Sequence, residues 1–374
     1  MSTQPNKPDE REGMPSGSGA KRWLTCPGSH LAERGLPDSK NDDAAEGEML
    51  HAVMESPASS HRAKLSDEQA HCIEFCRATR LKLSEEILGT DEPQAFVEER
   101  WWLRNPATLD PVASCRVDWA GFSDDSMIVL DWKFGRKAVD PADVNDQLRF
   151  AAAVAWQEYY PESVFVGIVA PRADGERVTV ARFSSAQCQA AHAEMVAGAL
   201  RAMQPGQPRC PSAGACHYCR ARGTEACPES IAETTALATV STSEIATPER
   251  VAELLDKCEL AERVIDAIRA NAKRMISDGV SVPGWRLKPG NKPKKITDPV
   301  AAWSRVGQNL IGGAAFAKCC TVSIKALADA VKANSTTEKL TDKSAREKVE
   351  SLLGDCITET QNAPSLAREV TSKT

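Results

Sequence analysis

The residues with the clearest chemical potential in this sequence are Asp118, Asp131 and Lys133. They lie in a stretch that predicts a β-hairpin, since 113–122 and 127–134 are apolar and β-prone and a turn-forming cluster separates them. Side chains alternate along a strand, so Asp131 and Lys133 share one face. If the two arms pair around the turn, Asp118 comes within reach of Asp131.

Two neighbouring carboxylates repel each other unless a positive charge separates them, and a hard divalent cation such as Mg²⁺ suits that position. A lysine beside the ion can orient or deprotonate a water and stabilise negative charge on a phosphate. The alternative is a surface turn with scattered charges, because the Asp-x-Lys tripeptide is common in proteins.

Two further side chains are candidates for the same site. Residues 42–55 predict a helix on which Gly47 and His51 share a face, so that another backbone can approach the glycine and meet the histidine. Residues 141–159 predict a helix with Pro141 in its first turn, and Gln147 lies beside the apolar stripe where it can face the hairpin. The alternative for His51 is a helix histidine satisfied by solvent.

A second constellation consists of cysteines. Cys216 and Cys219 form a CxxC pair, Cys227 follows, and Cys210 precedes them. A two-residue gap lets both sulfurs reach one centre, so the segment predicts a metal or cluster site without deciding between zinc and iron–sulfur. Cys26, far upstream, is by itself a small buried hydrophobe.

The chain has 374 residues, 42% of them hydrophobic, which predicts two domains with packed cores. Its 13 cysteines are an odd number in a chain with no secretion signal or membrane-spanning run, so we expect reduced thiols in an intracellular protein. The net charge of −6 supplies no global basic field, so a DNA-acting protein of this composition needs local basic patches and a metal ion.

The order of predicted elements is a helix at 66–88, a strand at 96–103, the hairpin, a helix, strands at 163–170 and 177–183, and a helix at 184–203. This pattern indicates an α/β layer arrangement around a mixed sheet. The polar residues 1–20 predict a disordered N-terminus. Residues 231–247 predict a linker, and 248–374 a mainly helical C-terminal domain that begins with a long helix at 248–279.

A basic segment follows this long helix. It surrounds an aromatic residue and is predicted to bind nucleic acid through Trp285, Arg286, Lys288, Lys292, Lys294 and Lys295. Basic residues with an aromatic side chain can hold a phosphate backbone. The alternative is a solvated turn.

The ordered set of His51, Asp118, Asp131, Lys133 and Gln147 resembles the PD-(D/E)XK nuclease superfamily, in particular its RecB-like branch. The resemblance covers about residues 20–300, and most firmly the part up to Pro228. It implies a nuclease core made of a mixed central sheet flanked by helices, in a nuclease domain at 21–230. The sequence is most similar to an uncharacterised phage and prophage family with this core. One departure is that members often carry a tyrosine four residues after the glutamine, where this chain has Ala151.

The resemblance also assigns roles. His51, Asp118 and Asp131 are expected to hold Mg²⁺ or Mn²⁺, and Lys133 to position the attacking water, with Gln147 beside them. Several similar nucleases hold a 4Fe–4S cluster with one cysteine before the core and three after it. The matching ligands are Cys26, Cys216, Cys219 and Cys227, with Cys210 as a possible substitute and zinc as the alternative metal.

The implied function is a metal-dependent DNA exonuclease in phage DNA recombination or processing, which leaves 5′-phosphate and 3′-hydroxyl ends. Its expected partners are DNA and a phage single-strand annealing or DNA-binding protein, in the cytoplasm of a bacterial host cell and not at a membrane. One alternative is a catalytically silent DNA-binding accessory protein with a structural iron–sulfur or zinc site. The other is a zinc-bound interaction module on an unrelated α/β fold.

Overall fold

The computed structural model divides the chain by its internal contacts into two units. One unit is Met1–Leu287 with Thr371–Thr374, and the other is Lys288–Val370. The structure describes residues 11, 13–37, 42–56, 65–123, 125–136, 139–173, 175–240, 247–287, 300, 304, 313, 323–334 and 340–353. None of the helices in these ranges is long and apolar enough to cross a bilayer.

A five-stranded sheet with strand order β1-β2-β3-β4-β5 forms the centre of the first unit. The strands are β1 (Gln94–Arg104), β2 (Pro111–Phe122), β3 (Ser126–Trp132), β4 (Ser163–Val169) and β5 (Val178–Ser184). The pair β3–β4 is parallel and the other three pairs are antiparallel. The parallel pair needs a crossover, which α5 (Asp146–Tyr159) provides. The predicted hairpin is confirmed as β2 and β3.

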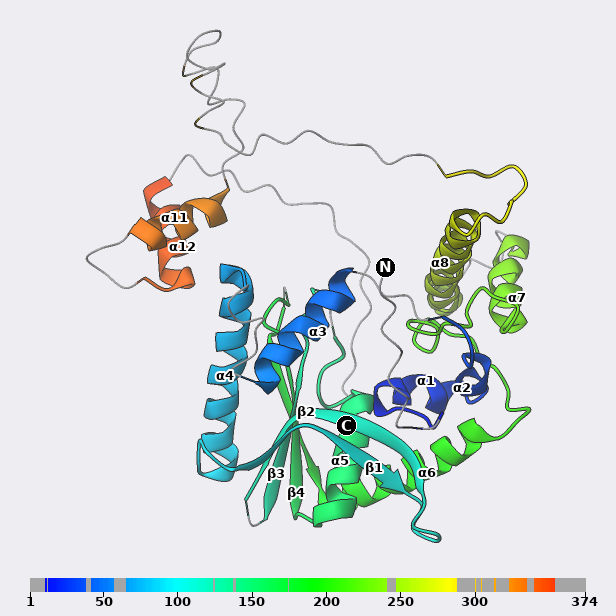
Figure 1. Cartoon of the computed structure of the whole chain (residues 1–374), viewed down its shortest axis with the longest axis horizontal. Helices are drawn as coiled ribbons and strands as arrows, with labels where there is room; N and C mark the ends of the chain where they lie inside the picture. The colour runs from blue at the N-terminus through cyan, green and yellow to red at the C-terminus, as the bar shows by residue number, and fades with distance from the viewer. Residues whose placement is uncertain are drawn as a thin grey trace. The chain divides into compact units, whose positions relative to one another are not determined.

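Helices cover both faces of this sheet (Figure 1). On one face, α3 (Asp42–Glu55) and α4 (Asp67–Leu88) pack on Ile128, Leu130 and Trp132 of β3. On the other face, α5 and α6 (Ser185–Met203) pack on the alternate β3 residues Met127 and Val129. The predicted α/β arrangement with a mixed sheet flanked by helices is therefore confirmed.

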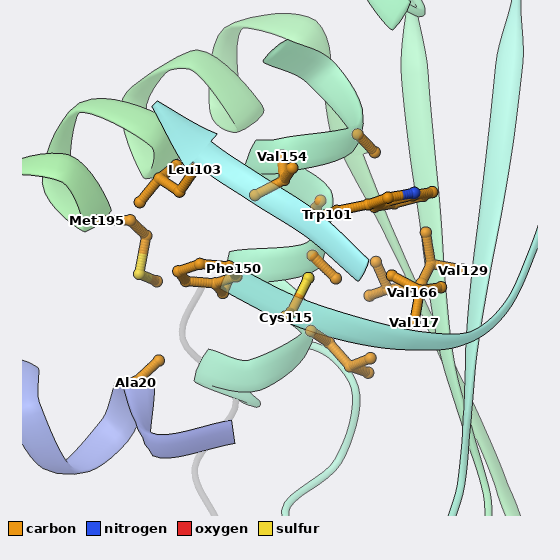
Figure 2. Close-up of a cluster of buried hydrophobic side chains, with 14 of the residues drawn as sticks. Ala20, Trp101, Leu103, Cys115, Val117, Val129, Phe150, Val154, Val166 and Met195 are labelled. Carbon is orange, nitrogen blue, oxygen red and sulfur yellow. The ribbon is translucent and has the colours of Figure 1, made fainter. Parts of the chain in front are cut away.

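The larger core lies between the sheet and the α5–α6 layer (Figure 2). Phe150 of α5 and Cys115 of β2 belong to this cluster, with Met195 of α6 and Ala20 of α1 (Ala20–Thr25). All four side chains are buried. Because α1 takes part in this core, residues far upstream of the sheet are fixed against it.

The predicted disordered N-terminus is wrong for residues 13–20. The backbone N–H of Ser114 donates to Pro15 O, the indole N–H of Trp23 donates to Ser16 O, and Gly17–Gly19 forms the 3-10 helix η1. A Cβ on Gly17 would stand 2.8 Å from both Cys115 and Phe150, so only glycine permits this approach. Residues 1–10 and 12 lie outside the described ranges.

The crossover helix starts later than predicted. It begins at Asp146 and not at Pro141, because the Asn145 side chain accepts hydrogen bonds from the N–H groups of Gln147 (3.0 Å) and Leu148 (3.2 Å). This is an N-cap, which defines the first turn of a helix. Gln147 therefore lies in the first turn of α5.

The remaining helices of the first unit are α2 (Ser29–Ala32), α7 (Pro228–Ala236), η3 (Leu237–Thr239) and α8 (Pro248–Ser277). Part of the predicted linker 231–247 is thus helical, and the division between the units falls after Leu287. Leu260 and Val264 of α8 pack on Cys216, which explains why α8 belongs with the sheet. The second unit contains α11 (Ile324–Asn334) and α12 (Asp342–Leu353), which pack through their own small core.

Candidate active site

The hairpin brings Asp118 and Asp131 to the same place in the sheet. The pairing of β2 with β3 ends at Trp119 and Leu130, so the next position in register sets the two aspartates opposite each other. The strands separate at this point, and Asp118 Oδ2 accepts a hydrogen bond from the backbone N–H of Trp132 at 2.7 Å. The end of pairing leaves room between the two carboxylates.

Asp131, Lys133 and Gln147 form a closed polar network. Lys133 Nζ lies 2.8 Å from Asp131 Oδ2 and donates to Gln147 Oε1 at 3.3 Å, while Gln147 Nε2 donates to Asp131 Oδ1 at 2.6 Å. Asp131 is 7% exposed, whereas Lys133 and Gln147 are only partly buried. The structure thus joins three of the predicted site residues directly.

His51 reaches the same place from α3. Its Nδ1 lies 3.5 Å from Asp118 Oδ1, and its ring packs edge-on against Phe134 with the centroids 5.3 Å apart. The sequence predicted that another backbone approaches Gly47 and meets His51. This is wrong, since nothing lies within 4 Å of where a Cβ of Gly47 would stand. The Phe134 ring orients the histidine instead.

Glu98 is a further site residue, and the sequence reasoning missed it. It faces Asp118 across β1 and β2, because Val97 pairs with Trp119 and Glu99 with Val117. Its φ of 51° is unusual for a glutamate, and the turned backbone presents its side chain to the site. Glu98 Oε1 lies 3.5 Å from His51 Nδ1, and Oε2 lies 2.9 Å from Arg116 Nε. The sequence alone does not show which of Glu98 and Glu99 points toward the site, because the turned backbone at Glu98 breaks the regular alternation of the strand.

These groups have shifted pKa values with identifiable causes. Burial raises the pKa of Asp118 to about 7, and the charge of Asp131 adds to the shift. For His51, burial lowers the pKa, but Glu98 and Asp118 outweigh it and the net shift is upward. For Lys133, burial likewise opposes the charge, and Asp131 outweighs it so that the pKa is raised.

The donor set fits a hard divalent cation. Within the described ranges, the group with three potential ligand atoms inside 4.8 Å of one another is His51, Glu98 and Asp118. Glu98 Oε1 is buried and accepts no hydrogen bond of good geometry, which is the condition of a carboxylate oxygen that a cation would satisfy. Asp131 is not in this group, because both of its oxygens face Lys133 and Gln147.

The four predicted cluster cysteines lie in one region, where the chain after α6 meets α1. All are buried, and Cys26 Sγ accepts a hydrogen bond from the backbone N–H of Cys210 at 3.1 Å. Burial raises the pKa of the Cys26 thiol, and the charges of Cys210 and Cys227 contribute. The structure therefore brings Cys26 beside residues about 190 positions downstream.

The spacing of these sulfurs bears on what they could hold. In the described part of the chain, no three cysteine sulfurs lie within 4.8 Å of one another. A tetrahedral zinc site with Zn–S bonds of about 2.3 Å needs sulfurs roughly 3.8 Å apart. A cubane cluster holds its cysteines further apart, because two irons stand between each pair of sulfurs.

The predicted nucleic-acid segment is described only in part. Trp285 and Arg286 are exposed, whereas Lys288, Lys292, Lys294 and Lys295 lie outside the described residues. The structure therefore places none of the four lysines.

Two comparisons with known proteins bear on identity. The crystal structure of SSO0001 aligns with 57% of this chain and 85% of its own, at 13% identity and a TM-score of 0.28, which is too weak a likeness to assign a fold. The model of a protein family of unknown function, DUF2800, matches residues 14–87 and 71–373. These matches span most of the sequence, and the chain therefore belongs to the DUF2800 family.

Proposed function

We propose that this protein is a metal-dependent deoxyribonuclease with a PD-(D/E)XK-type core, as the resemblance in its motifs implies. The observation that carries the proposal is the convergence of Asp118, Asp131 and Lys133 where β2 and β3 separate, with His51 and Glu98 beside them. Carboxylates gathered in a largely buried place cost folding free energy, and catalysis gives a reason for keeping them together.

The metal would be held by His51, Glu98 and Asp118, and by Asp131 once an oxygen turns from Lys133. When bound, a Mg²⁺ or Mn²⁺ ion supplies Lewis acidity toward the phosphate and lowers the pKa of a coordinated water. The chain itself contributes the fixed orientation of His51 against Phe134 and the backbone N–H of Trp132 that positions Asp118.

Lys133 would act as a cation. Its pKa is raised by Asp131, so its ammonium stays protonated at neutral pH and cannot serve as a general base without losing that partner. A protonated Nζ held by Asp131 and Gln147 is placed to donate to a phosphate oxygen and to the attacking water. This assigns Lys133 to charge stabilisation and water positioning.

The four cysteines would hold a 4Fe–4S cluster that joins the N-terminal helices to the segment after α6. The sulfurs come from both ends of the nuclease unit, so the cluster would close a very long loop. The finer assignment rests on the resemblance in the motifs. It is an exonuclease in phage DNA recombination that leaves 5′-phosphate ends.

The direct test is incubation of the purified protein with linear and circular DNA, single- and double-stranded, with Mg²⁺ or Mn²⁺. We expect cleavage of linear DNA, and a loss of at least two to three orders of magnitude in Asp131→Asn and Lys133→Met, since metal-ion catalysis supplies several kcal/mol. Asp91→Asn, a change at an exposed turn, is the matched control. Equal cleavage by all three variants would reject the site, and an inactive parent would favour the silent DNA-binding protein.

A further inference from the structure

Two polar cavities lie side by side on the first unit. One of about 270 Å³ is lined by Arg11, Ser16, Arg100, Arg116 and Gln147, among others. The other, of about 180 Å³, is lined by Arg11, Ser16, Arg22, Arg34, Arg220 and Glu33, among others. Arg11 and Ser16 belong to both linings, so the two cavities adjoin, and we call them together the arginine groove.

The arginine groove begins at the candidate active site. Gln147, which lines its first cavity, hydrogen-bonds to both Asp131 and Lys133. Arg116, on the same lining, lies 2.9 Å from Glu98 Oε2. A ligand that leaves the carboxylates in this direction would enter the groove directly.

The groove is strongly cationic in a chain whose net charge is −6. Its described lining holds six arginines and a single acid, Glu33. Glu33 is buried and already has partners. Its Oε2 lies 2.9 Å from Arg22 Nη2, and its Oε1 accepts a hydrogen bond from the backbone N–H of Arg220 at 2.7 Å. Guanidinium groups in this number suit phosphate oxygens, which they bind through paired N–H donors.

An exposed aromatic side chain lies on the loop that carries Cys216 and Cys219, which we call the cysteine loop. Tyr218, between Cys216 and Cys219, is 73% exposed. Arg220, two residues further along the same loop, lines the second cavity, so the exposed ring lies close to the groove. An exposed ring beside a phosphate-binding groove offers a surface on which an unpaired base can stack.

From these features we infer that the arginine groove is the path of a single DNA strand, with successive phosphates in its two cavities and a base stacked on Tyr218. The inference rests on the proposed nuclease site and adds the route by which substrate reaches it. It also assigns binding to arginines of the folded unit, separately from the basic segment around Lys292.

The geometry favours one strand over a duplex. The phosphates must follow a concave path from Gln147 past the N-terminal segment at Ser16 to α2 and the cysteine loop. A flexible single strand can bend into consecutive hollows, whereas the phosphates of a duplex stay on a stiff convex cylinder. Stacking on Tyr218 also requires a base that is not paired.

The test uses the full-length protein with Ca²⁺ in place of Mg²⁺ and fluorescein-labelled oligothymidylates of about 4 and about 16 nucleotides, the range of known site sizes. Arg100→Gln is expected to raise Kd for both lengths about 3- to 10-fold and to lower the salt slope by about 0.7. Arg34→Gln, at the far cavity, should weaken only the longer oligonucleotide, because the shorter one ends before reaching it.

Arg269→Gln provides the matched control, since it removes the same charge from an exposed position on α8 whose ion pair, among the described residues, is with Asp266 of the same helix. Tyr218→Ala should weaken single strands and leave duplex binding unchanged, and Tyr218→Phe should restore the affinity. Melting curves identify any variant that fails to fold. Equal Kd values for Arg100→Gln, Arg34→Gln and Arg269→Gln would overturn the inference, as would tighter binding of duplex than of single strand.

The two proposals fail in different ways. If the groove variants lose affinity while the parent cuts no DNA, the groove is a binding site and the nuclease proposal falls. If the parent cuts DNA and the groove variants keep parental Kd and cleavage rates, the nuclease proposal stands and the path of the strand lies elsewhere.

Discussion

Asp118 and Asp131 are neighbours with different electrostatic environments. Asp131 has a lysine and an amide donor within hydrogen-bonding distance, whereas the hydrogen bond that Asp118 receives comes from the neutral N–H of Trp132. The pKa of Asp118 consequently rises to about 7 through burial and through the charge of Asp131. Without a metal, Asp118 therefore keeps its proton up to about neutral pH.

This asymmetry predicts how stability depends on pH. Because the folded state raises the pKa of Asp118 from 3.8 to about 7, the metal-free protein should lose stability as pH rises between those values. Asp118→Asn removes that cost while its side-chain oxygen can still accept from Trp132. We expect the variant, in chelator, to be more stable than the parent by about 1–3 kcal/mol at pH 8 and nearly equal to it at pH 4.

Thermal melts at both pH values check this prediction. Asp118 must lose its proton to bind Mn²⁺, so Mn²⁺ binding should release a proton below pH 7. The Mn²⁺ affinity measured by calorimetry should therefore rise with pH and level off above pH 7. A variant less stable than the parent at pH 8 would show that Asp118 stabilises the fold as an anion, contrary to this account.

Glu98 offers a second residue-level prediction, with an adjacent control. Glu98→Gln should raise the Kd for Mn²⁺ by roughly 10- to 100-fold, a range seen even for residues that only support a ligand, and cleavage should fall with it. Stability should stay close to parental, since the change removes a buried charge. Glu99→Gln, one residue along the strand and exposed, should alter neither quantity. If the two variants bind Mn²⁺ alike, Glu98 is not a ligand.

At the scale of elements, glycines allow the segment before α1, and α1 itself, to pack closely on the sheet and helices. Gly17 approaches β2 and α5, and a Cβ on Gly198 of α6 would stand 2.6 Å from Leu24 of α1. These contacts fix α1, and with it Cys26, against the α5–α6 layer. In the sequence, Gly17 belongs to a polar segment that favours disorder.

The cysteine site gives the prediction at this scale. Cys26→Ala should lower the iron and sulfide content of anaerobically purified protein and destabilise the whole first unit, because a ligand from the N-terminal helices is lost. Cys188→Ala, at a fully buried cysteine of α6, should reduce stability through packing alone and keep the iron.

Elemental analysis, absorbance in the visible blue and melting curves make the comparison. Zinc without iron or sulfide would rule out the cluster. Full iron retention in Cys26→Ala would release Cys26 from the site and point to Cys210, whose N–H already contacts its sulfur, as the fourth ligand.

At the scale of the whole molecule, the division after Leu287 separates the sheet, the cysteine region and α8 from the second unit. A chain ending at Leu287 should therefore fold, keep its metal and cut DNA, because every residue of the candidate site lies within it. It lacks Lys288, Lys292, Lys294 and Lys295, so its DNA affinity should fall with a shallower salt dependence if the basic segment holds phosphates.

Circular dichroism, iron content and binding across a salt series test the truncation. The full chain carrying three combined substitutions should lose as much DNA affinity as the truncated chain. These substitutions are Lys292→Ala, Lys294→Ala and Lys295→Ala. An unfolded truncation would show that the second unit supports the first, and unchanged binding would reduce the basic segment to a solvated turn.

The sequence by itself determined the elements and the pairing of the two aspartates. Period-two apolar strands, capped helices and a short turn are local signals, and the turn fixes the register that sets Asp118 opposite Asp131. The Asp-x-Lys alternation likewise fixed Lys133 on the face of Asp131, where Gln147 meets both.

Only the tertiary structure decided the rest. Glu98 belongs to the site because its φ is positive and because Asp118 of β2 lies opposite it. The sequence contains no signal that would distinguish Glu98 from Glu99 in either respect. His51 depends on how α3 docks and on Phe134, and the arginine groove gathers residues from the N-terminal segment, β1, β2 and the cysteine loop. These contacts join positions far apart in the chain, where packing and not local preference sets the distance.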